Sequence, residues 1–129
     1  MKKAILMTVF LLIPGFCMAD HHSESIVEMW KCELKEGKKM EDVDANNKKW
    51  LAMTRKVTGS EEVQSFTLNP VVGSQNRFMF ADVFPDMAAW AKAKSADETE
   101  EGKAINATFD ELLDCAVNRL FTSERTSLE

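Results

Sequence analysis

A short run of almost entirely apolar residues, from Phe78 to Phe84, constrains the fold more than any other feature of this sequence. It contains three phenylalanines, a methionine, an alanine and a valine, and its one polar residue is Asp82. A strand that is apolar at nearly every position is usually covered on both faces. We therefore expect residues 77–84 to form a strand in the interior of a packed sheet.

The rest of the chain divides into β and α patterns on either side of this run. Near alternation of β-favouring residues predicts strands at 26–34 and 63–72, and Pro70 indicates that the second is an edge strand. Helical spacing of apolar residues, acidic residues early, basic residues late and a following Gly59 predict a helix over 40–57. Further helices are expected at about 86–94 and 102–113, with a polar break at 95–101, and a last strand at 117–122. This β-α-β-β-α-β order predicts one α+β domain with a ferredoxin-like fold, a four-stranded antiparallel sheet with its helices on one face.

Three stretches of the sequence resemble the dimeric α+β barrel superfamily, which includes the antibiotic-biosynthesis-type monooxygenases. They are Leu34-Lys35-Glu36-Gly37-Lys38, the run at 78–84, and Asp86-Met87-Ala88-Ala89-Trp90. The resemblance covers residues 26–122 and lies in element order and texture, without a catalytic motif. It implies a homodimer in which two sheets pack face to face and enclose a pocket in each subunit. A bare, aromatic-rich sheet face on a single domain supports the same expectation.

The N-terminus has the pattern of a secretory signal peptide. Lys2 and Lys3 precede an apolar run, and a small residue, Ala19, ends it. We expect residues 1–19 to be removed, residues 20–25 to be flexible, residues 26–122 to form the domain and residues 123–129 to be a polar tail. The product would be periplasmic or secreted, without a stable membrane anchor. With 21 acidic against 16 basic residues, the composition argues against a nucleic-acid partner.

Two cysteines, Cys32 and Cys115, remain after removal of the leader, and an even number in an oxidising compartment favours a disulfide. Two buried free thiols are the alternative. If the cysteines face each other across the first and last strands, one uniform register makes three further favourable pairs. These pairs are Trp30 with Val117, Glu28 with Arg119, and Ile26 with Phe121.

Side-chain alternation then suggests a ligand pocket. Phe78, Phe80, Asp82 and Phe84 share one face of their strand, and we expect this bulky set to point into the dimer barrel while the smaller residues face the helices. The expected ligand-binding residues are Glu28, Trp30, Phe66, Phe80, Asp82 and Arg119. Asp82, Trp30 and Arg119 are the candidate catalytic residues, because a desolvated carboxyl has a raised pKa and can take a proton. The alternative is a filled dimer core in which Glu28 and Arg119 form a structural ion pair.

Both histidines, His21 and His22, lie before the first strand, and the chain has no tyrosine. This distribution argues against a haem ligand, a histidine triad or a zinc site in the domain, and we expect no cofactor. Cleavage after Ala19 would expose Asp20-His21-His22, whose amine, amides and imidazole suit Cu(II) or Ni(II). Oxygenases of the resembling family use Asn, Trp and Arg, residue types that Trp30, Trp50, Asn69 and Arg119 could supply.

Three functions are consistent with these patterns. The first is an exported homodimer that binds a small apolar or aromatic molecule. The second is a cofactor-independent monooxygenase acting on such a molecule. The third is a structural or protein-interaction dimer without a pocket.

Overall fold

The computed structural model describes residues 24–124 and 126. Seven elements follow one another along the chain. They are β1 (Ser25–Leu34), α1 (Met40–Thr58), β2 (Gln64–Leu68), β3 (Arg77–Phe84), α2 (Met87–Asp97), α3 (Glu100–Leu112) and β4 (Leu113–Ser123). The leader, its cleavage after Ala19 and the copper site at His21 and His22 lie outside the described residues. None of the helices in the described part of the chain is long and apolar enough to cross a bilayer.

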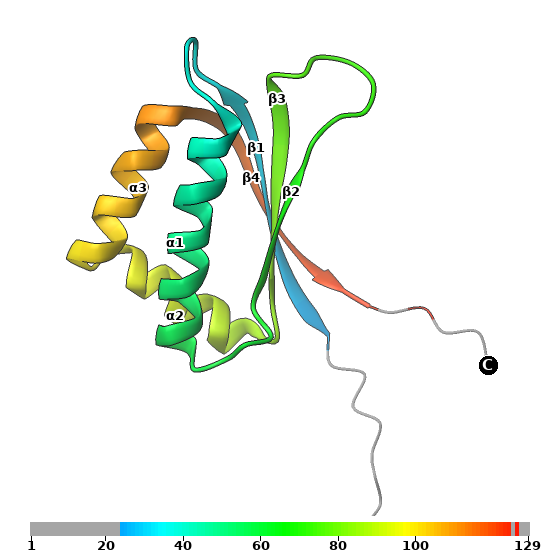
Figure 1. Ribbon diagram of the computed structural model, residues 1–129. Coiled ribbons are helices and arrows are strands. Elements are labelled where there is room, and N and C mark those ends of the chain that lie inside the picture. Colours follow the sequence, from blue (N-terminus) through cyan, green and yellow to red (C-terminus); the bar gives the residue numbers. More distant parts are fainter. Residues whose placement is uncertain (1–23, 125, 127–129) are drawn as a thin grey trace, which may run out of the picture.

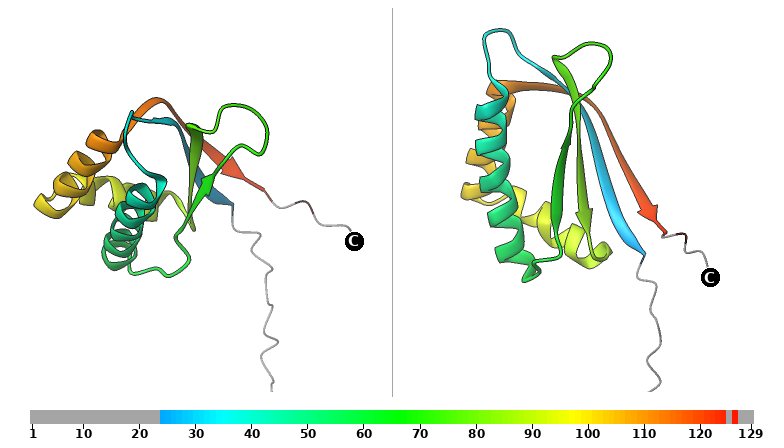
Figure 2. Two further views of the ribbon diagram at one scale, coloured as in Figure 1. Left: turned by 45° about the horizontal axis from the view of Figure 1, so that its top comes forward. Right: turned by 45° about the vertical axis from the view of Figure 1, so that its right-hand side comes forward.

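The four strands form one antiparallel sheet in the order β2-β3-β1-β4. All three helices of the described residues pack on the same face of this sheet, and no described element covers the opposite face, which we call the uncovered face (Figure 1). The two rotated views in Figure 2 show the same two-layer arrangement. The predicted α+β, ferredoxin-like fold is therefore confirmed, and β2 is the edge strand that the sequence indicated.

Local signals at the helix ends explain where the helices begin and stop. Gly59 ends α1 in the left-handed conformation (φ 69°), and its N–H donates to the Arg55 carbonyl. Asp86 caps α2 by accepting a hydrogen bond from the Ala89 N–H at 2.7 Å. Thr99 caps α3 in the same way through the N–H of Gly102.

Several predicted boundaries were wrong around α3. The polar break at 95–101 is reduced to Glu98 and Thr99, and β4 begins directly after α3 instead of at residue 117. The close turn depends on Gly102, because a Cβ at this position would lie 2.2 Å from the Ala96 carbonyl oxygen. The absence of a side chain therefore lets α3 start immediately beside the end of α2. Strand β2 is also shorter than predicted, ending at Leu68.

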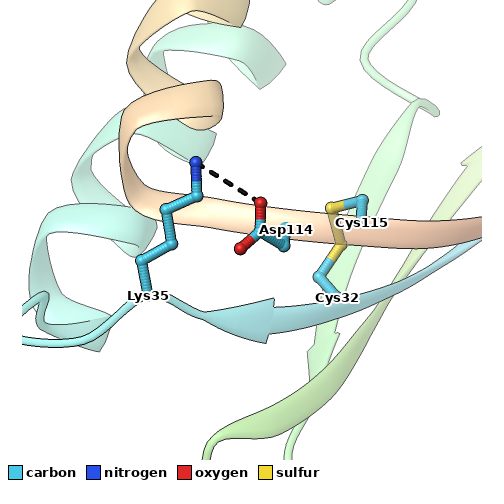
Figure 3. Close-up of a disulfide and its surroundings, with 4 residues drawn as sticks. All are labelled: Cys32, Lys35, Asp114 and Cys115. Carbon is cyan, nitrogen blue, oxygen red and sulfur yellow. Dashed lines mark ion pairs between the residues drawn. A yellow bond between two sulfur atoms is a disulfide. The ribbon is translucent and has the colours of Figure 1, made fainter.

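Cys32 and Cys115 form the predicted disulfide, which joins β1 to β4 beside the ion pair between Lys35 and Asp114 (Figure 3). The uniform register built on this bond was wrong. A β-bulge leaves Ala116 without a partner and shifts all later pairs by one residue. The pairs formed are Trp30 with Asn118, Glu28 with Leu120 and Ile26 with Thr122, in place of the three that the sequence suggested.

The bulky residues of β3 do share one face, but the expected side was wrong. Phe78, Phe80, Asp82 and Phe84 are buried against the helices, while Met79, Ala81 and Val83 face the uncovered side. Phe84 packs against α2, whose buried residues are the alanines Ala89, Ala93 and Ala96, whereas Phe78 and Phe80 pack in a second cluster with Val43 of α1 and Leu112 of α3. Because α2 supplies so little volume, the sheet must supply a large side chain beside this helix.

Candidate functional site

A cavity of about 250 Å³ lies between the helix-covered face of the sheet and the three helices. Its walls combine four aromatic rings with several polar side chains, which is the composition typical of small-molecule sites. The residues that line it are Trp30, Asn47, Trp50, Phe80, Asp82, Lys94, Asp97, Asn106, Phe109, Asp110, Leu113 and Cys115.

Asp82 is the most perturbed group in this cavity. Asp82 is only 6% exposed, and this burial raises the pKa of its carboxyl from 3.8 to about 7. The nearby charge of Glu28 also raises this pKa. The Ser65 hydroxyl donates to Asp82 Oδ1 at 2.5 Å, which lowers the pKa in part. Asn47 Nδ2 donates in turn to the Ser65 oxygen at 2.9 Å and so directs the hydroxyl hydrogen toward the carboxyl. In the described residues, no hydrogen bond reaches the other oxygen of Asp82.

Glu28 is the second buried carboxylate, and it is fully engaged. Its oxygens accept from Lys94 Nζ at 2.9 Å, from Asn118 Nδ2 at 2.7 Å and from Trp90 Nε1 at 3.3 Å. The β-bulge makes one of these bonds available, because the shifted register places Asn118 on the helix-covered side. Glu28 therefore holds Lys94 in place at the cavity wall.

Lys94 lies between two carboxylates. Its ammonium is 2.9 Å from Glu28 and 3.3 Å from Asp97, and it lies 5.9 Å from the centroid of the Trp30 ring. Burial alone would lower the pKa of Lys94, but the hydrogen bond and charge of Glu28, together with Asp97, raise it above its usual value. Lys94 is thus charged at neutral pH, and its charge is balanced by carboxylates inside the protein.

The structure divides the six residues predicted to bind a ligand between the two sides of the sheet. Trp30, Phe80 and Asp82 line the cavity, and Glu28 contacts it through Lys94. Phe66 and Arg119 lie on the uncovered face, so the six do not surround one chamber. The alternative ion pair between Glu28 and Arg119 does not form either, since Glu28 pairs with Lys94.

Sequence reasoning missed several residues of this cavity. Asn47 lies one turn before Trp50 on α1, and Lys94 and Asp97 have the same spacing on α2. Asn106 and Phe109 repeat this spacing on α3. Polar residues at helical spacing from buried aromatics were the available signal, but Asp97 fell within the expected polar break. Asn69, suggested as a source of the asparagine in an oxygenase site, does not line the cavity.

A larger depression of about 620 Å³ lies at the uncovered face, with Lys31, Leu68, Met79 and Val117 among its lining residues. Asp82, Lys94 and Asp97 do not line it. We therefore take the smaller cavity as the candidate site. Within residues 24–124 and 126, no group of three or more histidine, cysteine or acidic side chains is arranged to hold a metal ion.

The order of the elements and the antiparallel sheet with its helices on one face define an α+β protein with a ferredoxin-like fold. No family model and no curated protein matches the sequence. Among solved structures, the chain is similar to SnoaB, described as a cofactor-independent oxygenase from Streptomyces nogalater, with a TM-score of 0.62 and 13% identity over 82% of this chain and 99% of SnoaB. It is also similar to a NIPSNAP family protein from Agrobacterium tumefaciens, with a TM-score of 0.62 and 17% identity over 83% and 92% of the two chains. At these identities the similarity concerns the fold.

Proposed function

We propose that this protein binds a small aromatic or apolar molecule in the cavity between its sheet and its helices. The observation that carries the proposal is the combination in one cavity of four aromatic walls and a buried carboxyl with one free oxygen. The cavity is slightly smaller than the roughly 300 Å³ at which most ligand sites begin. The ligand should therefore be a molecule with a single ring or of similar size.

Ligand-detected NMR with a panel of one-ring aromatic compounds tests this proposal. A phenylalanine in place of Asn106 would fill the cavity, and Asn106→Phe should weaken binding of every hit by about tenfold or more. The matched control is Asn69→Phe, which adds the same ring outside the cavity and should leave binding unchanged. Absence of hits would favour the alternative of a structural dimer without a ligand site. Hits that Asn106→Phe does not weaken would mean that the molecule binds outside this cavity, and they would overturn the proposal.

A second candidate function is proton abstraction from the bound molecule, leading to cofactor-independent oxygenation. Asp82 favours it, because a carboxyl with a pKa of about 7 can accept a proton from a bound phenol or enol near neutral pH. The proton would move to the Asp82 carboxylate, and the ligand anion left behind would be oxidised by molecular oxygen, which takes up the electrons. SnoaB, which has a similar fold, is described as a cofactor-independent oxygenase.

Oxygen consumption with hydroquinones as substrates tests this second function. Uptake should be abolished by Asp82→Asn and retained by Asp114→Asn, which removes a carboxylate outside the cavity. Uptake that survives Asp82→Asn would exclude Asp82 as the base. No uptake with ligands that do bind would leave binding as the function.

We also propose that the protein is exported and works as a homodimer. A leader-like sequence at residues 1–19 and the Cys32–Cys115 disulfide support export. The uncovered sheet face supports the dimer, because Phe66, Leu68 and Phe121 on it are each more than 40% exposed. The second copy would cover this face and leave the cavity beneath the helices separate in each subunit.

A further inference from the structure

We infer that the molecule bound in this cavity is a protonated amine carried on an aromatic or other apolar body. The inference rests on the proposed function above and specifies the chemical class of the ligand. Three features support it: an excess of carboxylates at the wall, carboxylate oxygens that lack a partner, and aromatic rings suited to a cation.

The charges at the cavity wall are unequal. Asp82, Asp97 and Asp110 line it, and among its described lining residues Lys94 is the one cationic side chain. The Lys94 charge is already used, because Glu28 lies 2.9 Å away and Asp97 lies 3.3 Å away. The cavity therefore has an uncompensated negative charge, which attracts a cation and repels a carboxylate or a phosphate.

Two of these carboxylates have an oxygen with no partner in the described part of the chain. Asp97 pairs with Lys94 through Oδ2, while its Oδ1 is buried without a hydrogen bond. Asp82 accepts from Ser65 through Oδ1 alone. Asp97 is close enough to Asp82 for its charge to raise the Asp82 pKa. An ammonium group offers three N–H donors, one of which would satisfy the free Asp82 oxygen, whereas a neutral hydroxyl offers only one. The Asp97 Oδ1 atom is too deeply buried to contact the ligand, so Asp97 acts through its charge.

The aromatic walls favour the same ligand. Trp30, Trp50, Phe80 and Phe109 line the cavity, and aromatic rings attract a cation that lies against their faces. The Lys94 ammonium already lies 5.9 Å from the Trp30 ring centroid, a distance at which this attraction operates. The rings would hold the apolar body of the ligand, and the carboxylates would hold its ammonium.

Protonation of Asp82 gives the inference a pH signature. The titratable groups around this carboxyl are Glu28 on β1, Lys94 and Asp97 on α2, and Asp110 on α3. The pKa of Asp82 is about 7, so its carboxyl becomes charged as the pH rises from 6 to 8. An alkylammonium keeps its proton up to roughly pH 9. Amine affinity should therefore increase several-fold over this interval.

The test compares three probes of nearly equal size: 2-phenylethylamine, 2-phenylethanol and phenylacetate. Isothermal titration calorimetry of the full domain at pH 8 should show the amine binding about tenfold or more tightly than the alcohol, and the carboxylate binding most weakly. Asp97→Asn should weaken amine binding by about tenfold and leave the alcohol unchanged. The matched control is Glu98→Gln, which removes the same charge from the adjacent, exposed residue outside the cavity.

The outcomes separate this inference from the proposed function. If the alcohol or the carboxylate binds as tightly as the amine, the amine inference is overturned while ligand binding stands. If none of the three binds and the wider panel also gives no hits, both are wrong. The probe series and the pH dependence are measured on the unaltered protein, so the inference can be rejected even if Asp97→Asn fails to fold.

Discussion

The two faces of the sheet carry opposite kinds of side chain in opposite environments. The helix-covered face buries charge, since Glu28 is 3% exposed and Asp82 is 6% exposed. The uncovered face instead exposes apolar side chains, such as Phe66 and Phe121. Both arrangements are unfavourable for an isolated domain, because buried charges need partners and exposed aromatic patches need cover.

The comparison shows that the covered face lacks hydrogen-bond partners and the uncovered face lacks a packing partner. On the covered face, Glu28 accepts hydrogen bonds from three side chains, while Asp82 and the neighbouring Asp97 of α2 each keep one oxygen that no described residue bonds. The uncovered face, in contrast, lacks a second apolar surface that would pack against its exposed side chains. The covered face therefore suits a small polar-headed ligand, and the uncovered face suits a second protein surface.

The largest expected effect on stability concerns β4. Most residues of this edge strand are exposed, whichever face of the sheet they lie on, so β4 does not share the contrast between the two faces. The disulfide closes a loop across a sequence separation of 83 residues, so replacing both cysteines by serine should lower the free energy of unfolding by about 4 kcal/mol. Urea denaturation measures this loss, and hydrogen exchange should show β4 losing protection before β3. A loss below about 1 kcal/mol would show that the backbone ladder alone holds this edge.

The next prediction compares the loss of stability when a lysine is replaced on each side of the sheet. Lys94→Met leaves Glu28 buried without its cation and should cost about 3 kcal/mol. Lys31→Met makes the same change at an exposed position on the uncovered face and should change stability by about 0.5 kcal/mol or less. Chemical denaturation of both variants measures the difference. Equal effects would mean that Glu28 does not depend on Lys94, and the double variant Glu28→Gln with Lys94→Met should regain part of the loss.

An effect of similar size and opposite sign is expected at Asp82. Its folded-state pKa of about 7 exceeds the unfolded value of 3.8, so the folded state keeps a proton that the unfolded chain releases, and stability falls as the pH rises from about 4 to 7. Asp82→Asn removes this penalty and should stabilise the protein by about 2–4 kcal/mol at pH 8, with little gain at pH 4, because each pKa unit of the shift corresponds to about 1.4 kcal/mol. Thermal unfolding across this pH range measures the gain. The control is Glu33→Gln, which neutralises a carboxylate on the uncovered face and is measured over the same pH range.

The smallest change in stability is expected when a charged side chain is introduced on the uncovered face. Phe66→Glu should alter unfolding of the subunit by only about 0.5 kcal/mol, because the ring is already 46% exposed. The same substitution should convert the proposed dimer into a monomer in sedimentation velocity, whereas Ser74→Glu in the β2–β3 loop should not. A parent protein that sediments as a monomer at tens of micromolar would refute the dimer.

Much of the fold could be predicted because its signals are local. The alternation in β1, the glycine after α1 and the capping Asp86 each act within a few residues, and they led to the correct element order. The predicted register failed for a reason that is not local. A single unpaired residue, Ala116, reverses the face of every later side chain in β4, and the ladder as a whole determines whether such a bulge is accommodated.

The sequence by itself determined the order of the elements, the cysteine pair and the sharing of one face by Phe78, Phe80, Asp82 and Phe84. Only the tertiary structure decided which side that face occupies and which partners its charges find. Alternation along a strand sets which residues lie together, but it is symmetric between the two sides of a sheet. The alanine-rich α2 breaks that symmetry by leaving room for Phe84, and it brings Lys94 and Asp97 to the buried carboxylates.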